Sequence, residues 1–138
     1  MSKMSVAQAI IKILLNEEVT KAFCVPGESY LSIMDALNDQ EQIQLISGRH
    51  EGGVSFMTEA YAKASGKVGV CFATRGPGAA NLSIGLHTAM QDSTPVVAFI
   101  GQVRRDFRNK EGFQEIDHAR YFSDLVKWTV ERSNVNIG

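Results

Sequence analysis

The chain has 138 residues, of which 44% are hydrophobic and 21% are charged, and its formal net charge at pH 7 is -1. This length matches one ordinary domain, and the apolar content is too high for a disordered chain. The balance of 14 basic and 15 acidic residues argues against a nucleic-acid or membrane-surface partner. No apolar run approaches the roughly 20 residues of a membrane helix.

The first residues carry no targeting signal, because residues 1–5 lack the apolar core that follows the cationic head of a signal peptide. We therefore expect a cytoplasmic protein. The two cysteines, Cys24 and Cys71, each lie inside an apolar run. This setting predicts two buried thiols and no disulfide.

Helical and strand patterns alternate along the chain. Ser5 and Gln8 have the spacing of a capping box, and the apolar residues behind them predict a helix to about Glu17. The third helix, over 54–64, should end at Gly66 in the left-handed conformation. The other expected elements are strands over 21–25, 43–46, 68–74 and 95–100, and helices over 31–37 and 82–92.

The pattern changes in the last third of the chain. Residues 104–111 are rich in charge and lack apolar periodicity, which predicts an exposed, mobile loop. Asp117 is placed to cap a short helix through Phe122. A last alternation of apolar residues predicts an edge strand: Val126, Trp128 and Val130.

Strand–helix–strand units with short connections predict an α/β fold, in which a mainly parallel sheet lies between two layers of helices. Right-handed crossovers place the carboxyl ends of the strands at one edge, where open α/β sheets bind their ligands. The turns expected there are residues 26–28, 49–53, 74–78 and 101–102. These turns contain many of the glycine, proline and charged residues of the chain, so this edge is the candidate site.

Glu51 opens a helix directly after a strand, and this position has two interpretations. The carboxylate can simply complement the helix macrodipole. Alternatively, it is a partly desolvated group on the ligand edge that shares a proton with a ligand nitrogen. Gly52 and Gly53 would then let another surface approach the backbone closely.

The turn at 74–78 lacks the spacing of a P-loop and of the dinucleotide fingerprint. With Pro77 as the first helical residue, it is either a tight strand–helix turn or a holder of a polar ligand group. Gln114 and Glu115, at the end of the charged loop, suit an ordinary surface loop when taken alone. The histidines lack metal-ligand spacing and the serines lie outside a G-x-S-x-G elbow, so we expect neither a metal site nor serine hydrolysis.

Several motifs follow one another along nearly the whole chain: Val25-Pro26-Gly27, residues 49–53, 66–71, 76–82, 92–97 and 101–103, and Phe113-Gln114-Glu115. In this order they resemble the N-terminal pyrimidine-binding domain of thiamine-diphosphate-dependent enzymes of the acetolactate synthase type. The resemblance implies the three-layer α/β/α fold of that family, with flavodoxin-like topology. It assigns residues 1–130 to this domain and residues 131–138 to a tail or the start of an interdomain linker.

The resemblance also implies roles for single residues. Glu51 matches the glutamate that hydrogen-bonds N1′ of the cofactor pyrimidine and favours the imino tautomer, which deprotonates the thiazolium carbon. Pro26 and Gly27 match the turn that lies against the pyrimidine. Gln114 matches a glutamine on the substrate side, with Phe113 as its apolar neighbour. The positions that match the pocket wall are Thr74, Gly76 and Asn81.

The chain departs from the family pattern at two positions and in one motif. Arg75 stands where serine often precedes Gly-Pro-Gly, and Glu28 stands where acetolactate synthases commonly have a second glycine. Both put a charge near the expected site. The Gly-Asp-Gly…Asn motif of the family's second domain, which holds the diphosphate through Mg²⁺, has no match here. The resemblance therefore implies half a site, inactive alone and completed by a diphosphate-binding domain in cis or in a partner chain.

We expect a domain of a thiamine-diphosphate-dependent 2-oxoacid carboligase that acts on a substrate such as pyruvate. The alternatives are half of a 2-oxoacid decarboxylase and a non-catalytic interaction domain that binds no cofactor alone. Binding of FAD, which occurs in some relatives, is left open. A homodimer is expected through an apolar surface that includes Met57, Tyr61 and the helix start at Gly52-Gly53.

Overall fold

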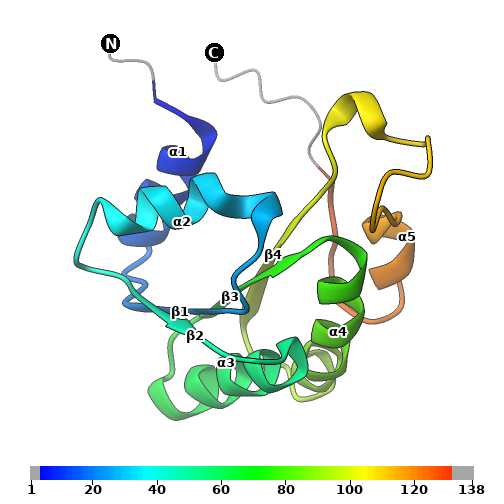
Figure 1. Ribbon diagram of the computed structural model, residues 1–138. Coiled ribbons are helices and arrows are strands. Elements are labelled where there is room, and N and C mark those ends of the chain that lie inside the picture. The colour runs from blue at the N-terminus through cyan, green and yellow to red at the C-terminus, as the bar shows by residue number, and fades with distance from the viewer. Residues whose placement is uncertain (1–3, 132–138) are drawn as a thin grey trace.

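The computed structural model describes residues 4–131, which form a four-stranded sheet between two layers of helices (Figure 1). The strands are β1 (Lys21–Cys24), β2 (Gln44–Ser47), β3 (Gly69–Thr74) and β4 (Val96–Gly101). Their order is β2-β1-β3-β4, and every neighbouring pair is parallel. The predicted α/β/α class and parallel sheet are confirmed. Almost all of the tail expected over 131–138 lies outside the described residues.

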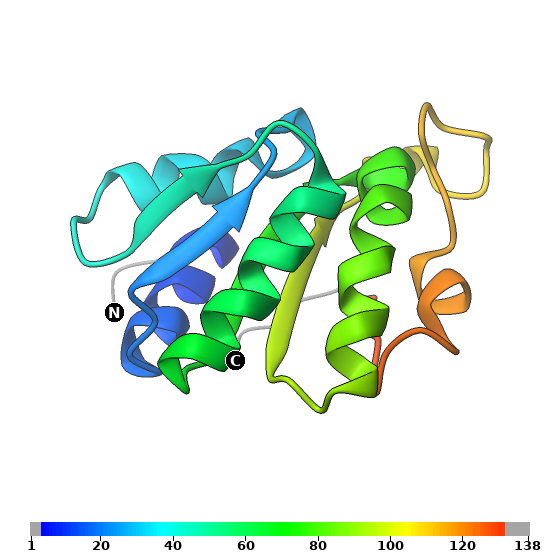
Figure 2. The ribbon, with the colours of Figure 1, turned by 90° about the horizontal axis from the view of Figure 1, so that it is seen from below.

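Two helices cover each face of the sheet. On one face lie α1 (Val6–Asn16) and α2 (Leu31–Asn38), and on the other α3 (Glu51–Ser65) and α4 (Arg75–Gln91) run side by side (Figure 2). Three short helices complete the fold: η1 (Glu28–Tyr30), η2 (Arg105–Phe107) and α5 (His118–Phe122). Of these, α5 lies beside α4 (Figure 2). No helix within residues 4–131 is long and apolar enough to cross a membrane.

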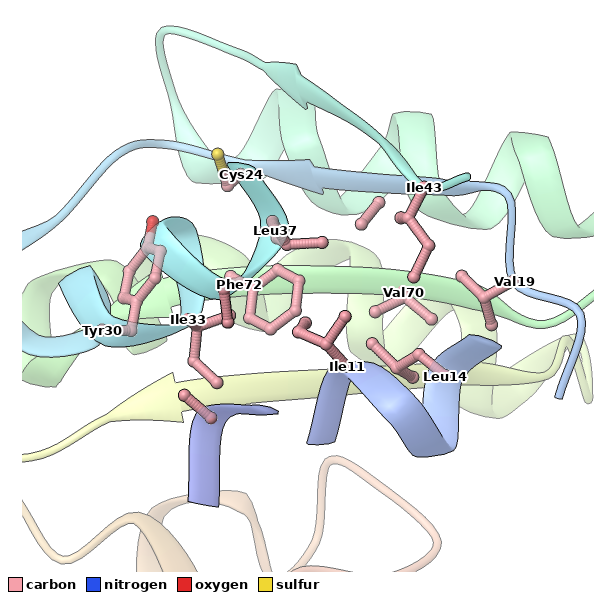
Figure 3. Packing of buried hydrophobic residues seen from close by; sticks show 13 residues of the cluster. Ile11, Leu14, Val19, Cys24, Tyr30, Ile33, Leu37, Ile43, Val70 and Phe72 are labelled. Carbon is pink, nitrogen blue, oxygen red and sulfur yellow. The ribbon is translucent and has the colours of Figure 1, made fainter. Parts of the chain in front are cut away.

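Large apolar side chains fill the space between the sheet and the α1/α2 layer (Figure 3). Phe72 of β3 lies at the centre, stacked on Tyr30 at 5.9 Å and on Phe99 at 5.2 Å between ring centroids. Full burial of one such side chain stabilises the fold by about 1.5–3 kcal/mol. The residues that surround Phe72 in this cluster include Ile11, Leu14, Ile33, Leu37 and Val70.

Small residues bring α3 and α4 together on the opposite face. An added Cβ at Gly85 of α4 would come within 2.2 Å of Ser55 Oγ in α3. An added Cβ at Gly69 of β3 would come within 2.5 Å of the carbonyl oxygen of Thr58. The buried hydroxyls of Ser55 and Thr58 donate hydrogen bonds to carbonyl oxygens one turn earlier in α3, at 2.8 and 2.7 Å. The close approach of α3, α4 and β3 fixes the positions of the N-terminal ends of the two helices relative to the sheet.

The local signals read from the sequence are largely confirmed. Ser5 and Gln8 form both hydrogen bonds of a capping box at the start of α1. Gly66 ends α3 in the left-handed conformation with φ of 69°. Asp117 caps α5 by accepting a hydrogen bond from the N–H of Arg120 at 3.0 Å. The thiols of the two cysteines, Cys24 and Cys71, are free and buried, as predicted.

Two local predictions are wrong. Helix α4 begins at Arg75, so Pro77 is its third residue and not its first. Proline is tolerated there because the N–H groups of the first helical turn have no partner within the helix. The segment around Val126, Trp128 and Val130, which was expected to form an edge strand, has no regular secondary structure up to residue 131. It follows a turn in which the N–H of Val126 donates a hydrogen bond to the carbonyl oxygen of Phe122. Val126 packs against the apolar cluster on the α4 side, but Trp128 is 72% exposed and Val130 is exposed as well, so the alternation does not mark a buried face.

Candidate cofactor site

The carboxyl ends of the parallel strands lie at the edge of the sheet where α3 and α4 begin (Figure 2). The turns after β1, β3 and β4 touch one another there. An added Cβ at Gly27 would lie 2.5 Å from Thr74 Cβ, and one at Gly101 would lie 2.0 Å from Ser29 Oγ. The hydroxyls of Ser29 and Thr74 are hydrogen-bonded at 2.7 Å. The predicted convergence of these turns is therefore found, and the two glycines permit it.

Glu51 is the first residue of α3, and only 9% of its surface is exposed. The preceding residue, His50, caps the helix, because its Nδ1 accepts a hydrogen bond from Gly52 N–H at 3.0 Å. Asn81 of α4 donates from Nδ2 to Glu51 Oε2 at 3.0 Å. The structure thus brings Glu51 and Asn81 into direct contact and fixes one oxygen of the carboxyl group beside a helix N-terminus.

Gly78 leaves room beside the second oxygen of that carboxyl group. A Cβ added there would lie 3.5 Å from Glu51 Oε1 and 3.3 Å from Ala73 Cβ. A side chain at position 78 would therefore lie in van der Waals contact with Oε1. The contact between Glu51 and Asn81, and the capping of α3 by His50, were not predicted from the sequence, since each depends on how helix starts are placed.

The chain returns to the same edge after β4. The N–H of Gly76 donates to the carbonyl oxygen of Gln114 at 2.8 Å, and an added Cβ at Gly76 would lie 2.8 Å from that oxygen. Gln114 has a positive φ of 66° and is partly buried. Its neighbour Phe113 is 75% exposed. The backbone therefore holds Gln114 against the start of α4, beside the turn that carries Thr74.

Arg108 anchors the loop that carries Gln114. Its guanidinium lies 3.1 Å from a carboxylate oxygen of Glu115 and 2.8 Å from one of Glu131. Glu115 also accepts the N–H groups of Asn109 and Gly112 at 2.8 and 3.1 Å. These contacts, first of all the hydrogen bond from the Asn109 backbone, lower the pKa of Glu115. The loop is largely exposed, as predicted, while its mobility stays a prediction.

The two charges singled out near the expected site form an ion pair with each other. Arg75 Nη1 lies 2.7 Å from Glu28 Oε1. Arg75 is the residue between Thr74 and Gly76, and its φ of 46° is unusual for a residue with a side chain. The sequence pointed to both charges but did not show that they would meet.

His118 is a buried residue behind this edge that sequence reasoning missed. Its Nδ1 lies 3.1 Å from Gln102 Nε2, which also donates to Ile116 O at 2.9 Å. Loss of solvent around the ring lowers the pKa of His118. Among residues 4–131, no three or more His, Cys, Asp or Glu side chains are grouped to hold a metal ion.

Comparison with known families identifies the domain. Residues 4–121 match the family model described as "Thiamine pyrophosphate enzyme, N-terminal TPP binding domain". The chain belongs to this family. As an N-terminal TPP-binding domain, it carries Glu51, Asn81 and the turns at Gly27 and Gly76 within the matched residues.

Similar curated proteins are acetolactate synthases. The TPP-binding domain is 45% identical over 124 residues to the "Probable acetolactate synthase large subunit" of Methanococcus aeolicus. The aligned region covers 90% of this chain and 20% of that protein. It is 45% identical over 122 residues to the acetolactate synthase large subunit of Porphyra purpurea, and this alignment covers 86% of this chain and 21% of the relative. It is 39% identical over 129 residues to the acetolactate synthase of Bacillus subtilis, covering 94% and 22%. The chain thus spans about a fifth of the length of these relatives.

Proposed function

We propose that this chain is the pyrimidine-binding half of an acetolactate synthase-like enzyme, a thiamine-diphosphate-dependent 2-oxoacid carboligase. The observation that carries the proposal is the buried carboxyl group of Glu51, held by Asn81 at the ligand edge of a parallel sheet. Thiamine diphosphate, when bound, supplies a thiazolium carbon that adds to the carbonyl group of a 2-oxoacid. The part of Glu51 is to hold and exchange a proton at N1′ of the pyrimidine ring.

The residues around Glu51 suit this task. Asn81 fixes Oε2, which leaves Oε1 for a ring nitrogen, and Gly78 keeps that side of the carboxyl group open. Burial strengthens a hydrogen bond between a carboxyl group and a ligand nitrogen, because the local dielectric is low. Pro26 and Gly27 would contact the pyrimidine, and the pocket wall would be formed by Thr74, Gly76 and Asn81.

Gln114 is proposed to contact the substrate. Its carbonyl oxygen is tied to Gly76, so the residue is held at the same edge as Glu51. A side-chain amide can donate to a carboxylate or carbonyl oxygen of a 2-oxoacid such as pyruvate. The exposed ring of Phe113 would provide an apolar neighbour for the substrate's alkyl group.

The other half of the site would come from a diphosphate-binding domain, in cis or in a partner chain, that holds Mg²⁺. The chain by itself should therefore bind thiamine diphosphate weakly, with Kd above about 1 mM, because an aminopyrimidine offers few contacts. Turnover by the chain alone is not expected. Binding of FAD is left open, and the cytoplasmic location stays a prediction.

Two alternative functions remain for this chain. A 2-oxoacid decarboxylase would use the same Glu51 but would protonate its intermediate and need no acceptor. A non-catalytic interaction domain would bind a partner chain and no cofactor. A mixture of the chain, a diphosphate-binding partner domain, Mg²⁺, thiamine diphosphate and pyruvate separates these functions. Acetolactate supports the carboligase, acetaldehyde with CO₂ supports the decarboxylase, and no product supports the interaction domain.

The substitution Glu51→Gln tests the site itself. It should leave the fold intact, because it changes a helix-dipole interaction of about 1 kcal/mol or less. In the reconstituted enzyme, it should slow hydrogen–deuterium exchange at the thiazolium carbon by about 10²–10⁴-fold, as expected for loss of a positioned acid–base group. The exchange is followed by quenched-flow NMR.

The matched control is Glu59→Gln. Glu59 is also a buried glutamate of α3, but it pairs with Lys63, two turns beyond the start of the helix. This variant should keep the wild-type exchange rate. If Glu51→Gln also keeps that rate with cofactor bound, Glu51 is only a helix-terminal acid and the proposed site is wrong.

A homodimer is proposed through the outer faces of α3 and α4. Met57 is exposed, as expected for this surface, and Tyr61 is only partly exposed. The Tyr61 ring packs on Phe23 and its hydroxyl bonds Thr20. The exposed apolar side chains on these two helices are Phe56, Met57, Ile84 and Met90.

Replacing one of these side chains by a charged one should break the dimer. Ile84 is the most exposed of them, at 58%, so Ile84→Glu would bury an unpaired charge in the interface at little cost to the fold. Light scattering over a concentration series measures the mass. A wild-type chain that stays monomeric at the highest concentration would contradict the proposed interface.

A further inference from the structure

The side chain of Arg75 is largely buried at the ligand edge, and that of its acidic partner is largely exposed. The side chain of Arg75 is 18% exposed, whereas that of Glu28 is 66% exposed. The contact is made by Nη1 of Arg75, at 2.7 Å from Glu28 Oε1. Nε of Arg75 is fully buried and has no hydrogen-bond partner. The pair therefore leaves part of the binding capacity of the guanidinium unused.

The position of Arg75 in the chain places it among the residues of the proposed site. Thr74 before it contacts Gly27, and Gly76 after it is bonded to Gln114. Glu28, which holds the guanidinium, directly follows Gly27 in the turn after β1. The guanidinium thus lies at the turn proposed to contact the pyrimidine, and its backbone lies beside Gln114.

We infer that Arg75 binds the carboxylate group of the 2-oxoacid substrate and that Glu28 takes this place when no substrate is bound. The inference rests on the function proposed above and adds a specificity-determining residue to it. A guanidinium offers donors in a fixed fork that matches the two oxygens of a carboxylate. The substrate carboxylate would take the place that the Glu28 carboxylate occupies at Nη1.

The exchange of partners needs little rearrangement. Because Glu28 is largely exposed, its side chain can turn into water when an anion arrives, and a largely exposed carboxylate loses little by leaving an ion pair. The side chain of Arg75 is far less exposed, so it stays at the edge when Glu28 turns away. Uncharged compounds of the same size would not displace Glu28, so the pair selects for acids.

The experiment is an NMR titration of the isotope-labelled chain with pyruvate at constant ionic strength, observing the Nε–Hε signal of Arg75. Saturable shifts of this signal are expected with pyruvate and none with acetone, its uncharged analogue. Glu28→Gln should lower Kd for pyruvate about fivefold, which corresponds to the roughly 1 kcal/mol of a partly exposed ion pair. Arg75→Gln should abolish the saturable binding.

Arg104→Gln is the matched control. Arg104 also pairs with a single carboxylate, that of Asp106, with nitrogen–oxygen distances of 3.1 and 2.7 Å, but in the exposed loop after β4. Its substitution should leave Kd for pyruvate unchanged. The titration contains no cofactor, so its outcome does not depend on the role proposed for Glu51. Failure of the inference is thereby distinguished from failure of the proposed function, which the exchange rate at the thiazolium carbon tests.

The inference is overturned if the Arg75 signal does not respond to pyruvate, or if Glu28→Gln binds pyruvate no more tightly than the wild type. Either result would make the ion pair a purely structural contact. If Arg75→Gln fails to fold, the Glu28→Gln titration alone decides, because that variant keeps Arg75 and alters only its exposed partner. Equal shifts with acetone and pyruvate would likewise contradict recognition of a carboxylate.

Discussion

The two faces of the sheet differ in how closely their helices approach each other. Under α1 and α2, large apolar side chains around Phe72 fill the space (Figure 3). Under α3 and α4, apolar side chains such as Val54 and Leu82 are also buried, but small residues bring the two helices into close contact, such as Gly85 against Ser55. The first face depends on buried volume, and the second depends on close approach as well. Glu51 and Asn81 belong to the second face, where a displacement of either helix would separate them.

This difference predicts where loss of volume is most costly. Phe72 is fully buried between Tyr30 and Phe99. Phe72→Ala should reduce the free energy of unfolding by about 3–5 kcal/mol, because it removes buried apolar area and leaves a cavity. Urea denaturation followed by circular dichroism measures the change. A loss below about 1 kcal/mol would show that the first face does not depend on this side chain.

The second face should instead be sensitive to gain of volume. Gly85→Ala places a Cβ within 2.2 Å of Ser55 Oγ, so α3 and α4 must separate. The expected cost is about 1–3 kcal/mol, as for other overpacked sites. The measurement is again urea denaturation. Because the same helices carry Glu51 and Asn81, cofactor-dependent activity of the reconstituted enzyme should fall as well.

Gly53 provides the control in α3. A Cβ added there meets nothing within 4 Å, so Gly53→Ala should stabilise the chain by about 0.5–1 kcal/mol through the higher helix propensity of alanine. The free energy of unfolding should fall for Gly85→Ala and rise for Gly53→Ala. This difference in sign distinguishes the effect of close helix packing from that of helix propensity. Equal effects at the two positions would contradict the role assigned to the α3/α4 contact.

The same contrast explains what the sequence reveals. The first face could be predicted, because large apolar residues recur at helical spacing in α1 and the Ser5–Gln8 capping box marks where it begins. The parallel sheet and its ligand edge also followed from alternating elements. The close contact of α3 with α4 could not be predicted, since glycine and serine have no periodicity that identifies the neighbour they touch.

The candidate site shows the same division. Glu51 was identifiable, because an acid that opens a helix after a buried strand is a local pattern. Its contact with Asn81 and the pairing of Arg75 with Glu28 join residues 30 and 47 positions apart, and no local signal specifies them. The predicted strand at Val126 failed for the opposite reason. Apolar residues alternate in this segment as they do in a strand, but Trp128 and Val130 are exposed, so the alternation of residue types does not correspond to burial.

The smallest expected effect concerns His118, which joins the second face to the loop after β4. Burial lowers the pKa of His118 below its usual 6.5, although Glu131 and Asp117 oppose this shift and Arg108 adds to it. In the unfolded chain, the ring therefore takes up a proton at a higher pH than in the folded chain. The neutral His118 ring therefore makes its full contribution to the free energy of unfolding above pH 6.5, and this contribution is lost as the pH falls toward the folded-state pKa.

Urea denaturation between pH 7.5 and 5.5 should show a smaller decrease in the free energy of unfolding for His118→Gln than for the wild type. NMR titration of the His118 ring gives the folded-state pKa directly, and a midpoint at or above 6.5 would contradict the burial of this side chain.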